Sequence, residues 1–478
     1  MKIPEPNRTP RLRSPVATLM CLLAALFLFS GCHGIPTREE TAERQRAKSV
    51  TAAYRPDGAR PILPSLSPGA SWSDYIQFAV LNSPKVEAAY YEWIAAVERI
   101  TVERSLPDPR LTFQMDIAST VESLMPGLMV DLPGPGKLAA KAAVASAESA
   151  AKFATFQSAV LESVYGFKRA FHQTRLLQER IRVSRATLRL LEDLESAALK
   201  QNEVGKATLQ DVLRAQIEHD RLTTEIANLE QFKQPLSAQL KASLGLAANS
   251  PDIPLPVDLD PVSTNPPPET LLAQAFARNP RLKAMEAEIR QSEAAIALAR
   301  KSRIPDTSVG LEADPLASPV MFRPQAGITL PIWKDKLAAE LAAAKASSSA
   351  AKARLAAERI QIGMDLAEKS YMYREAVRNL ELAQSTLLPK ARLSLEVARA
   401  AYMAGKIDFL NVMDAWRTVL SMELEAISAR TQHELTLAEI SLLIAGVLPN
   451  GSPDWMTPAA TPTPAPSPSQ ASDSQHAH

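Results

Sequence analysis

Cysteine, glycine and aromatic residues are scarce in this chain of 478 residues. It holds two cysteines and 16 glycines, and 5% of its residues are aromatic. So few cysteines exclude a disulfide-rich domain, and the shortage of glycine and aromatic residues argues against a β-sandwich or an α/β enzyme. A formal net charge of +1 gives no support for a nucleic-acid partner. The abundant alanine and leucine instead favour long helices.

The N-terminus has the pattern of a secretory signal. Basic residues precede an apolar run at 16–29, which is too short for a transmembrane helix. The run ends at Phe29-Ser-Gly-Cys32, which resembles a bacterial lipoprotein signal cleaved before the cysteine. We therefore expect residues 1–31 to be the signal peptide and the Cys32 thiol to carry a covalent lipid such as palmitate, with no other cofactor. An ordinary signal peptide that happens to contain Cys32 is the alternative. The absence of an aspartate after the cysteine favours the outer membrane.

The rest of the chain divides into two halves with the same order of elements. Each half is predicted to contain two helices, two strands and then two long helices. The motif Leu106-Pro-Asp108 returns as Ile304-Pro-Asp306 in the second half. The predicted boundaries are an extended segment at 32–70, a first repeat at 71–246, a Pro/Asp-rich linker at 247–268, a second repeat at 269–447 and a disordered tail at 448–478.

Four short segments alternate between apolar and polar residues, which is the period of a β-strand. They lie at about 110–118, 127–133, 307–314 and 323–331. The expected outward, apolar residues are Leu111, Phe113, Ile117, Val130, Leu311 and Ile328. The expected inward, polar residues are Thr112, Gln114, Asp116, Glu312, Gln325 and Thr329.

These strands approach the roughly 9–11 residues that a tilted membrane strand needs. Four strands cannot close a barrel alone, and open strand edges are not tolerated in lipid. Three chains would supply twelve strands, an even number within the range of outer-membrane barrels. The alternative is a small soluble β-domain that packs against the helices.

Two glycine turns, about 200 residues apart, interrupt the long helices. The first is Val204-Gly-Lys-Ala-Thr-Leu-Gln-Asp-Val-Leu-Arg-Ala215, and the second is Ala404-Gly-Lys-Ile-Asp-Phe-Leu-Asn-Val-Met-Asp-Ala415. Each reads as a helix stop at glycine, a tight turn and the start of a new helix. A repeated turn between two pairs of long helices indicates a duplicated fold.

With these motifs the chain resembles the TolC family of outer-membrane efflux proteins over about residues 70–447. The resemblance implies a mainly α-helical protein with a membrane β-barrel. Three copies would form a twelve-stranded barrel in the outer membrane of a Gram-negative bacterium and an α-helical barrel in the periplasm. It also implies a periplasmic adaptor that links the tips to an inner-membrane pump of the resistance-nodulation-division type. The expected adaptor-docking residues at the tips are Gly205, Lys206, Gly405 and Lys406. The segment Leu132-Pro-Gly-Pro-Gly-Lys137 looks like the heavy-metal branch of the family.

The resemblance also implies a gate and a latch near the tips. The family's gate aspartates fall on Asn411 and Asp414, so the acid is missing at the first position. Its latch between neighbouring coils falls on Asp211 and Tyr402, while Ile407 replaces the basic member. The simpler alternative is that both aspartates are first-turn acids favoured by the helix dipole.

The leading hypothesis is therefore a passive export duct rather than an enzyme. No nucleophile–base pair, phosphate loop or metal cluster is evident in the sequence. The histidines at 172, 219 and 433 are isolated on helices, and those at 476 and 478 lie in the tail. The alternative function is a lipid-anchored periplasmic coiled-coil adaptor or spacer without a pore.

Overall fold

The computed structural model describes most of the two repeats. The described residues are 36–117, 121–256, 268–314 and 319–445. The predictions for the signal peptide, Cys32, residues 257–267 of the linker and the tail with its two histidines fall outside these residues.

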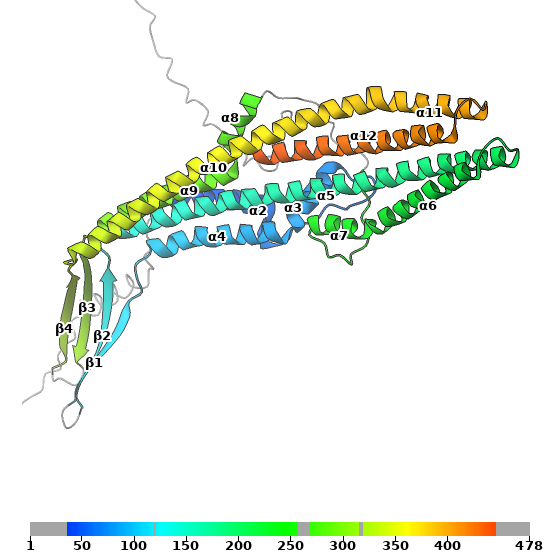
Figure 1. The fold of residues 1–478 in the computed structure, drawn as a ribbon. Coiled ribbons are helices and arrows are strands. Elements are labelled where there is room, and N and C mark those ends of the chain that lie inside the picture. Colours follow the sequence, from blue (N-terminus) through cyan, green and yellow to red (C-terminus); the bar gives the residue numbers. More distant parts are fainter. Residues whose placement is uncertain (1–35, 118–120, 257–267, 315–318, 446–478) are drawn as a thin grey trace, which may run out of the picture.

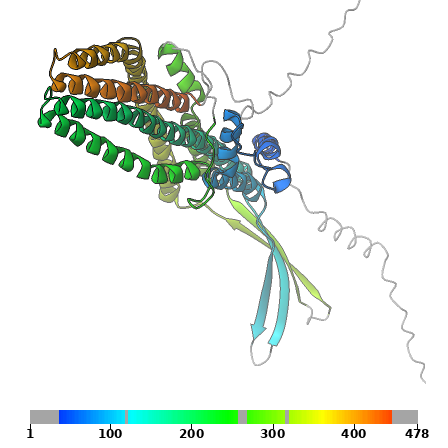
Figure 2. The same cartoon turned by 90° about the vertical axis from the view of Figure 1, so that its right-hand side faces the viewer.

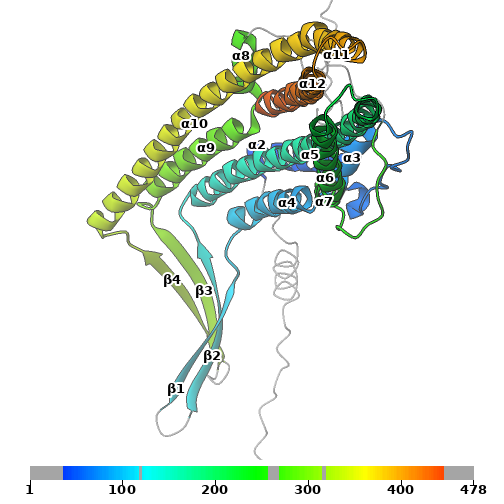
Figure 3. The ribbon, with the colours of Figure 1, turned by 45° about the vertical axis from the view of Figure 1, so that its right-hand side comes forward.

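The protein is elongated, with a sheet at one end and two helical hairpins reaching the other end (Figure 1). Views from two further sides show the strands projecting from the ends of the long helices (Figures 2 and 3). The elements are α2 (Arg38–Tyr54), α3 (Trp72–Asn82), α4 (Pro84–Arg104), β1 (Arg110–Ile117), β2 (Val121–Leu132), α5 (Lys137–Glu203), α6 (Leu209–Gln231), α7 (Lys233–Ser243), α8 (Pro268–Arg278), α9 (Pro280–Lys301), β3 (Asp306–Asp314), β4 (Met321–Thr329), α10 (Lys334–Leu382), α11 (Leu388–Met403) and α12 (Phe409–Leu443).

The four strands form one antiparallel sheet in the order β1-β2-β3-β4. Cross-strand partners place Leu111, Leu128 and Leu311 in one row, with 64%, 43% and 50% of their surfaces exposed. The neighbouring row on the opposite face includes Thr112 and Glu312, and Glu312 is 5% exposed. One face of the sheet is therefore apolar and uncovered, and the other is polar, as the alternation predicts.

The two β-hairpins are copies of one another at the level of strand register. Arg110 pairs with Met129 in the first hairpin, and adding 198 to both numbers gives Ser308 and Gly327, which pair in the second. The pair Leu111–Leu128 maps in the same way onto the pair of residues 309 and 326. The duplication predicted from sequence is therefore confirmed in the hydrogen-bonding pattern of the sheet.

Each hairpin of long helices has one continuous limb and one interrupted limb. Helix α5 runs for 67 residues, or about 100 Å, without a break. Its return limb is interrupted at Phe232, between α6 and α7 and three residues before Pro235. The proline ring clashes with the carbonyl four residues earlier, so the helix ends before the proline. In the second hairpin a π-helical segment, Ala383–Leu387, precedes Pro389 for the same reason.

Among the described helices, none is both long enough and apolar enough to cross a membrane.

Two predictions about local structure were wrong. Residues 38–54 of the segment expected to be extended form helix α2. Its apolar residues Ala47, Val50 and Tyr54 pack into a hydrophobic cluster but occupy only the second half of the helix, and ion pairs hold the first half, so no long apolar period marks it in the sequence. Glu40 is 1% exposed and lies 2.7 Å from the Arg104 guanidinium of α4. Strand β2 also begins at Val121, six residues before its predicted start.

The helical tips as a candidate entrance

The two glycine turns end their helices in the same way. Gly205 and Gly405 have φ values of 67° and 70°, in the left-handed region where a side chain is disfavoured. Each glycine amide donates a hydrogen bond of 2.9 Å to the carbonyl three residues earlier. The amides of Lys206 and Lys406 donate to the carbonyl five residues earlier, at 2.8 and 2.9 Å. This pair of hydrogen bonds ends the helix at each turn and leaves both lysine side chains exposed at the tip.

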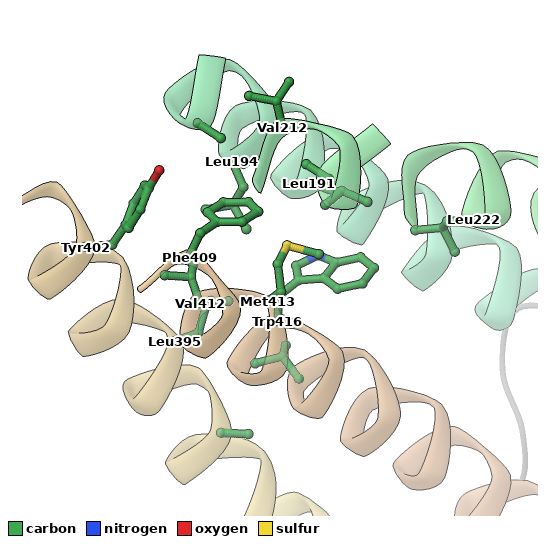
Figure 4. Packing of buried hydrophobic residues seen from close by; sticks show 14 residues of the cluster. Leu191, Leu194, Val212, Leu222, Leu395, Tyr402, Phe409, Val412, Met413 and Trp416 are labelled. Atoms are coloured by element: carbon green, nitrogen blue, oxygen red, sulfur yellow. The ribbon is translucent and has the colours of Figure 1, made fainter. Parts of the chain in front are cut away.

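A hydrophobic cluster joins the two hairpins just behind the tips (Figure 4). Helix α12 contributes Phe409, Val412 and Trp416, and α5 contributes Leu191 and Leu194. All five side chains are 0–1% exposed. The tips are therefore held by tight packing between the first and second repeats.

Two polar contacts cross the same junction. The buried Trp416 indole Nε1 donates to the Thr187 carbonyl of α5 at 3.2 Å. The Arg417 guanidinium of α12 donates to the Glu218 carboxylate of α6 at 2.8 Å. We name the contact between Arg417 and Glu218 the hairpin bridge. Neither contact is predicted from the sequence. Trp416 directly follows the second turn motif, but only the fold reveals its partner 229 residues away.

The predicted gate residues lie on the first turns of α12. Asn411 is exposed, and the Asp414 side chain is 61% exposed. The Asp414 carboxylate lies 3.5 Å from Arg417, so the hairpin bridge places a positive charge beside it. A groove of about 790 Å³, lined by residues of α6 and α12 that include Glu218 and Trp416, lies beside the bridge.

The predicted latch residues are close but are not joined by a hydrogen bond. The Asp211 carboxylate accepts from the Thr208 hydroxyl at 2.8 Å and from the Thr208 amide at 3.1 Å, so it caps its own helix. Tyr402 is 7% exposed, and its hydroxyl has no hydrogen-bond partner among the described residues. Burial, and then the nearby Asp211 charge, raise the pKa of Tyr402. The latch stays a prediction.

No group of three or more His, Cys, Asp or Glu side chains within the described ranges is arranged to hold a metal ion. His172 packs against the rings of Trp72 and Phe171. Burial lowers its pKa to about 4. His433 lies 3.3 Å from the Glu434 carboxylate.

Known proteins are similar to this chain over most of its length. The sequence profile of the family described as "Outer membrane efflux protein" matches residues 75–246 and 271–446. The cobalt-zinc-cadmium resistance protein CzcC of Cupriavidus metallidurans is 26% identical over 353 residues, which cover 72% of this chain and 82% of CzcC.

Solved channels share the fold at lower sequence identity. CusC superposes with a TM-score of 0.69 at 16% identity and covers 81% of this chain and 98% of its own. The outer membrane protein VceC of Vibrio cholerae gives 0.67 at 16% identity, covering 79% and 96%. These likenesses confirm the predicted fold class. The family profile matches both repeats, and the chain therefore belongs to the outer membrane efflux protein family.

Proposed function

We propose that three copies of this chain form a passive export duct through the outer membrane. The observation that carries the proposal is the sheet, which exposes an apolar face and leaves β1 and β4 as free edges. In lipid such edges must be paired, and three four-stranded sheets supply a closed twelve-stranded barrel. The polar face would then line the pore.

The helical body supports the same assembly. Apolar side chains follow α10 and α11 on an uncovered face, with exposed fractions between 55% and 75%. They are Ile360, Met364, Tyr371, Leu393 and Val397. A continuous apolar stripe of this kind favours contact with another protein surface. Neighbouring protomers would cover it and extend the barrel as a helical tube.

The tips are proposed as the gated periplasmic entrance. Three copies of Asp414 around one axis would attract cations and repel one another, with Asn411 as a neutral neighbour. Asp211 and Tyr402 would form the latch between coils. The exposed lysines of the two glycine turns would face a periplasmic adaptor, which connects the duct to an inner-membrane pump of the resistance-nodulation-division type. The duct itself performs no chemistry, and the pump supplies the energy.

The proposed anchor is a lipid on Cys32, which lies five residues before the N-cap Thr37 of α2. The start of α2 lies close to the roots of the strands, because Glu40 of α2 binds Arg104 and β1 begins at Arg110. The adaptor or spacer alternative does not account for a sheet with an uncovered apolar face.

Divalent metal cations are the proposed cargo. The likeness to a cobalt-zinc-cadmium resistance protein supports this class, and so does the Pro-Gly-Pro-Gly-Lys segment before α5. Cells that lack the protein should become sensitive to zinc, cobalt or cadmium and keep their tolerance of organic drugs. Drug sensitivity without metal sensitivity would refute the proposed cargo and leave the duct intact.

The duct is tested in planar bilayers with the purified protein. We expect discrete channel currents and a molecular mass of three chains in detergent. A protein that gives no pores under conditions where it remains folded would refute the proposal.

A further inference from the structure

The Pro-Gly-Pro-Gly-Lys segment forms a lock between the two repeats at the roots of the strands. The Asp306 carboxylate accepts from the Gly134 amide at 2.6 Å and from the Lys137 ammonium at 2.7 Å. A side chain at residue 134 would come within 2.6 Å of the Pro305 carbonyl, so only glycine permits this approach. Gly136 turns the chain with φ of 75° and brings Lys137 into place.

The free edges of the sheet carry a second pair of residues equivalent to this lock. Asp108 stands in Leu106-Pro-Asp108 as Asp306 stands in Ile304-Pro-Asp306. Lys334 is the first residue of α10, as Lys137 is the first residue of α5. The equivalence is by position in the helix, because the loop from Leu330 to α10 is one residue shorter than the loop from Leu132 to α5 and the offset there becomes 197. Asp108 and Lys334 are exposed, and neither has a hydrogen bond or ion pair among the described residues. They lie at opposite edges of the sheet, so they cannot meet within one protomer.

The duplication predicts what joins these edges. Both hairpins share one register with an offset of 198 residues. The contact between β2 and β3 is therefore the internal copy of a contact between β4 and the β1 of another chain. Inside the protomer, Leu128 pairs with Leu311. Adding 198 to residue 128 gives Ala326 of β4, and subtracting 198 from residue 311 gives Phe113 of β1 in the second chain. These two residues should therefore face each other, and both fall on the apolar face.

We infer that a second copy of this chain completes the lock, with Lys334 of one protomer bound to Asp108 of the next. The β4–β1 seam then has the register that places Ala326 opposite the neighbour's Phe113. This inference rests on the proposed function, because only a closed ring brings the two edges together.

The seam differs from the internal lock in one respect. The Ile332 amide, which is equivalent to that of Gly134, already donates to the Leu330 carbonyl at 2.9 Å. The seam therefore relies on the ammonium group, and charge becomes its main source of specificity. A charge change at either residue should weaken the assembly more than the fold.

Paired cysteines test the register. Facing residues on neighbouring strands have Cα atoms about 4.5–5.5 Å apart, which is within disulfide range. We expect oxidised Phe113→Cys/Ala326→Cys protein to give covalent dimers and trimers on denaturing electrophoresis. The off-register variant Leu111→Cys/Ala326→Cys should give few. The internal pair Leu128→Cys/Leu311→Cys should cross-link within one chain and stay at monomer size.

The outcomes distinguish a failure of the inferred seam from a failure of the proposed duct. If the wild-type protein is trimeric in detergent but the off-register pair cross-links better, or neither pair does, the inferred seam is wrong and the trimer stands. If the wild-type protein is monomeric, the proposed function itself fails.

Charge exchange tests the lock. We expect Asp108→Lys and Lys334→Asp each to lower the temperature at which the trimer dissociates, and the double exchange to restore it. Lys345→Asp is the matched control, because this lysine is also exposed on α10 and lies eleven residues beyond Lys334. Single exchanges that behave like Lys345→Asp, with no rescue in the double variant, would overturn the lock.

Discussion

The hairpin bridge should hold the entrance closed, and Arg417→Gln is the change that tests it. The side chain is 51% exposed, but its partner Glu218 is 13% exposed and the bond is 2.8 Å long. An ion pair of this partly exposed kind stabilises by up to about 1 kcal/mol. Loss of one bridge should therefore raise the open population of its protomer by about fivefold. If the three protomers open together, the loss of three bridges adds up to about 3 kcal/mol, which raises the open population on the order of a hundredfold.

Open probability in planar bilayers measures this effect. Arg221→Gln is the matched control, because Arg221 also binds Glu218, at 3.3 Å, but comes from the same helix and bridges nothing. Glu218→Gln should open the tip as Arg417→Gln does, although it changes the local charge in the opposite direction. That agreement would separate release of the bridge from a simple effect of charge on ion flow.

Two results would refute the reasoning. Arg417→Gln could leave the open probability unchanged, or it could match Arg221→Gln. Either would mean that packing around Trp416 holds the tips without help from the bridge.

Three further predictions concern the tips and the helical body. Asp414→Ala should raise the conductance of the closed channel and lower its preference for cations; unchanged conductance would mean that Asp414 is only a helix-terminal acid. Gly405→Ala should cost about 1 kcal/mol of stability, because φ is 70° there, and a thermal melt that matches wild type would contradict this. For His172, whose pKa of about 4 lies below the unfolded value of 6.5, the unfolded state binds the proton first as pH falls. Stability should be full above about pH 6.5 and fall by about 3 kcal/mol toward pH 4. His172→Phe should flatten that part of the pH profile of thermal unfolding, and an unchanged profile would assign it to other groups.

The sequence predicted features that arise from local chemistry. Strand alternation, helix length and the glycine stops depend on residues close together in the chain, and they account for the duplicated order of elements. The start of β2 was missed because Pro126 interrupts the alternation. At Pro126 the strand pairs only with β1, through Phe113, while its pairing with β3 begins at Gly127. The missing N–H of the proline is tolerated there because the side of β2 that faces β3 is unpaired at Pro126.

Contacts between distant segments could not be predicted. Trp416 and Thr187 belong to different repeats, and neither residue type identifies the other as its partner. Helix α2 was missed for the same reason, because the first half of this helix is held by the contact between Glu40 and Arg104 of α4. The candidate gate and latch residues came from a family resemblance, and the bridge beside them came from the fold.

The two repeats differ in charge at the tips, where we propose the entrance. The turns share Gly205 with Gly405 and Val212 with Val412, but at an offset of 200 Asp414 replaces Arg214 and Arg417 replaces Ile217. The bridge therefore depends on a charge that the second repeat carries and the first lacks at the equivalent position. Near the strands the repeats are alike instead. A seam that repeats around a ring needs equivalent locks, and there the repeats retain the Pro-Asp motif and the first lysine of each long helix. Residues shared by the repeats should therefore affect assembly when changed, and residues that differ at the tips should affect opening.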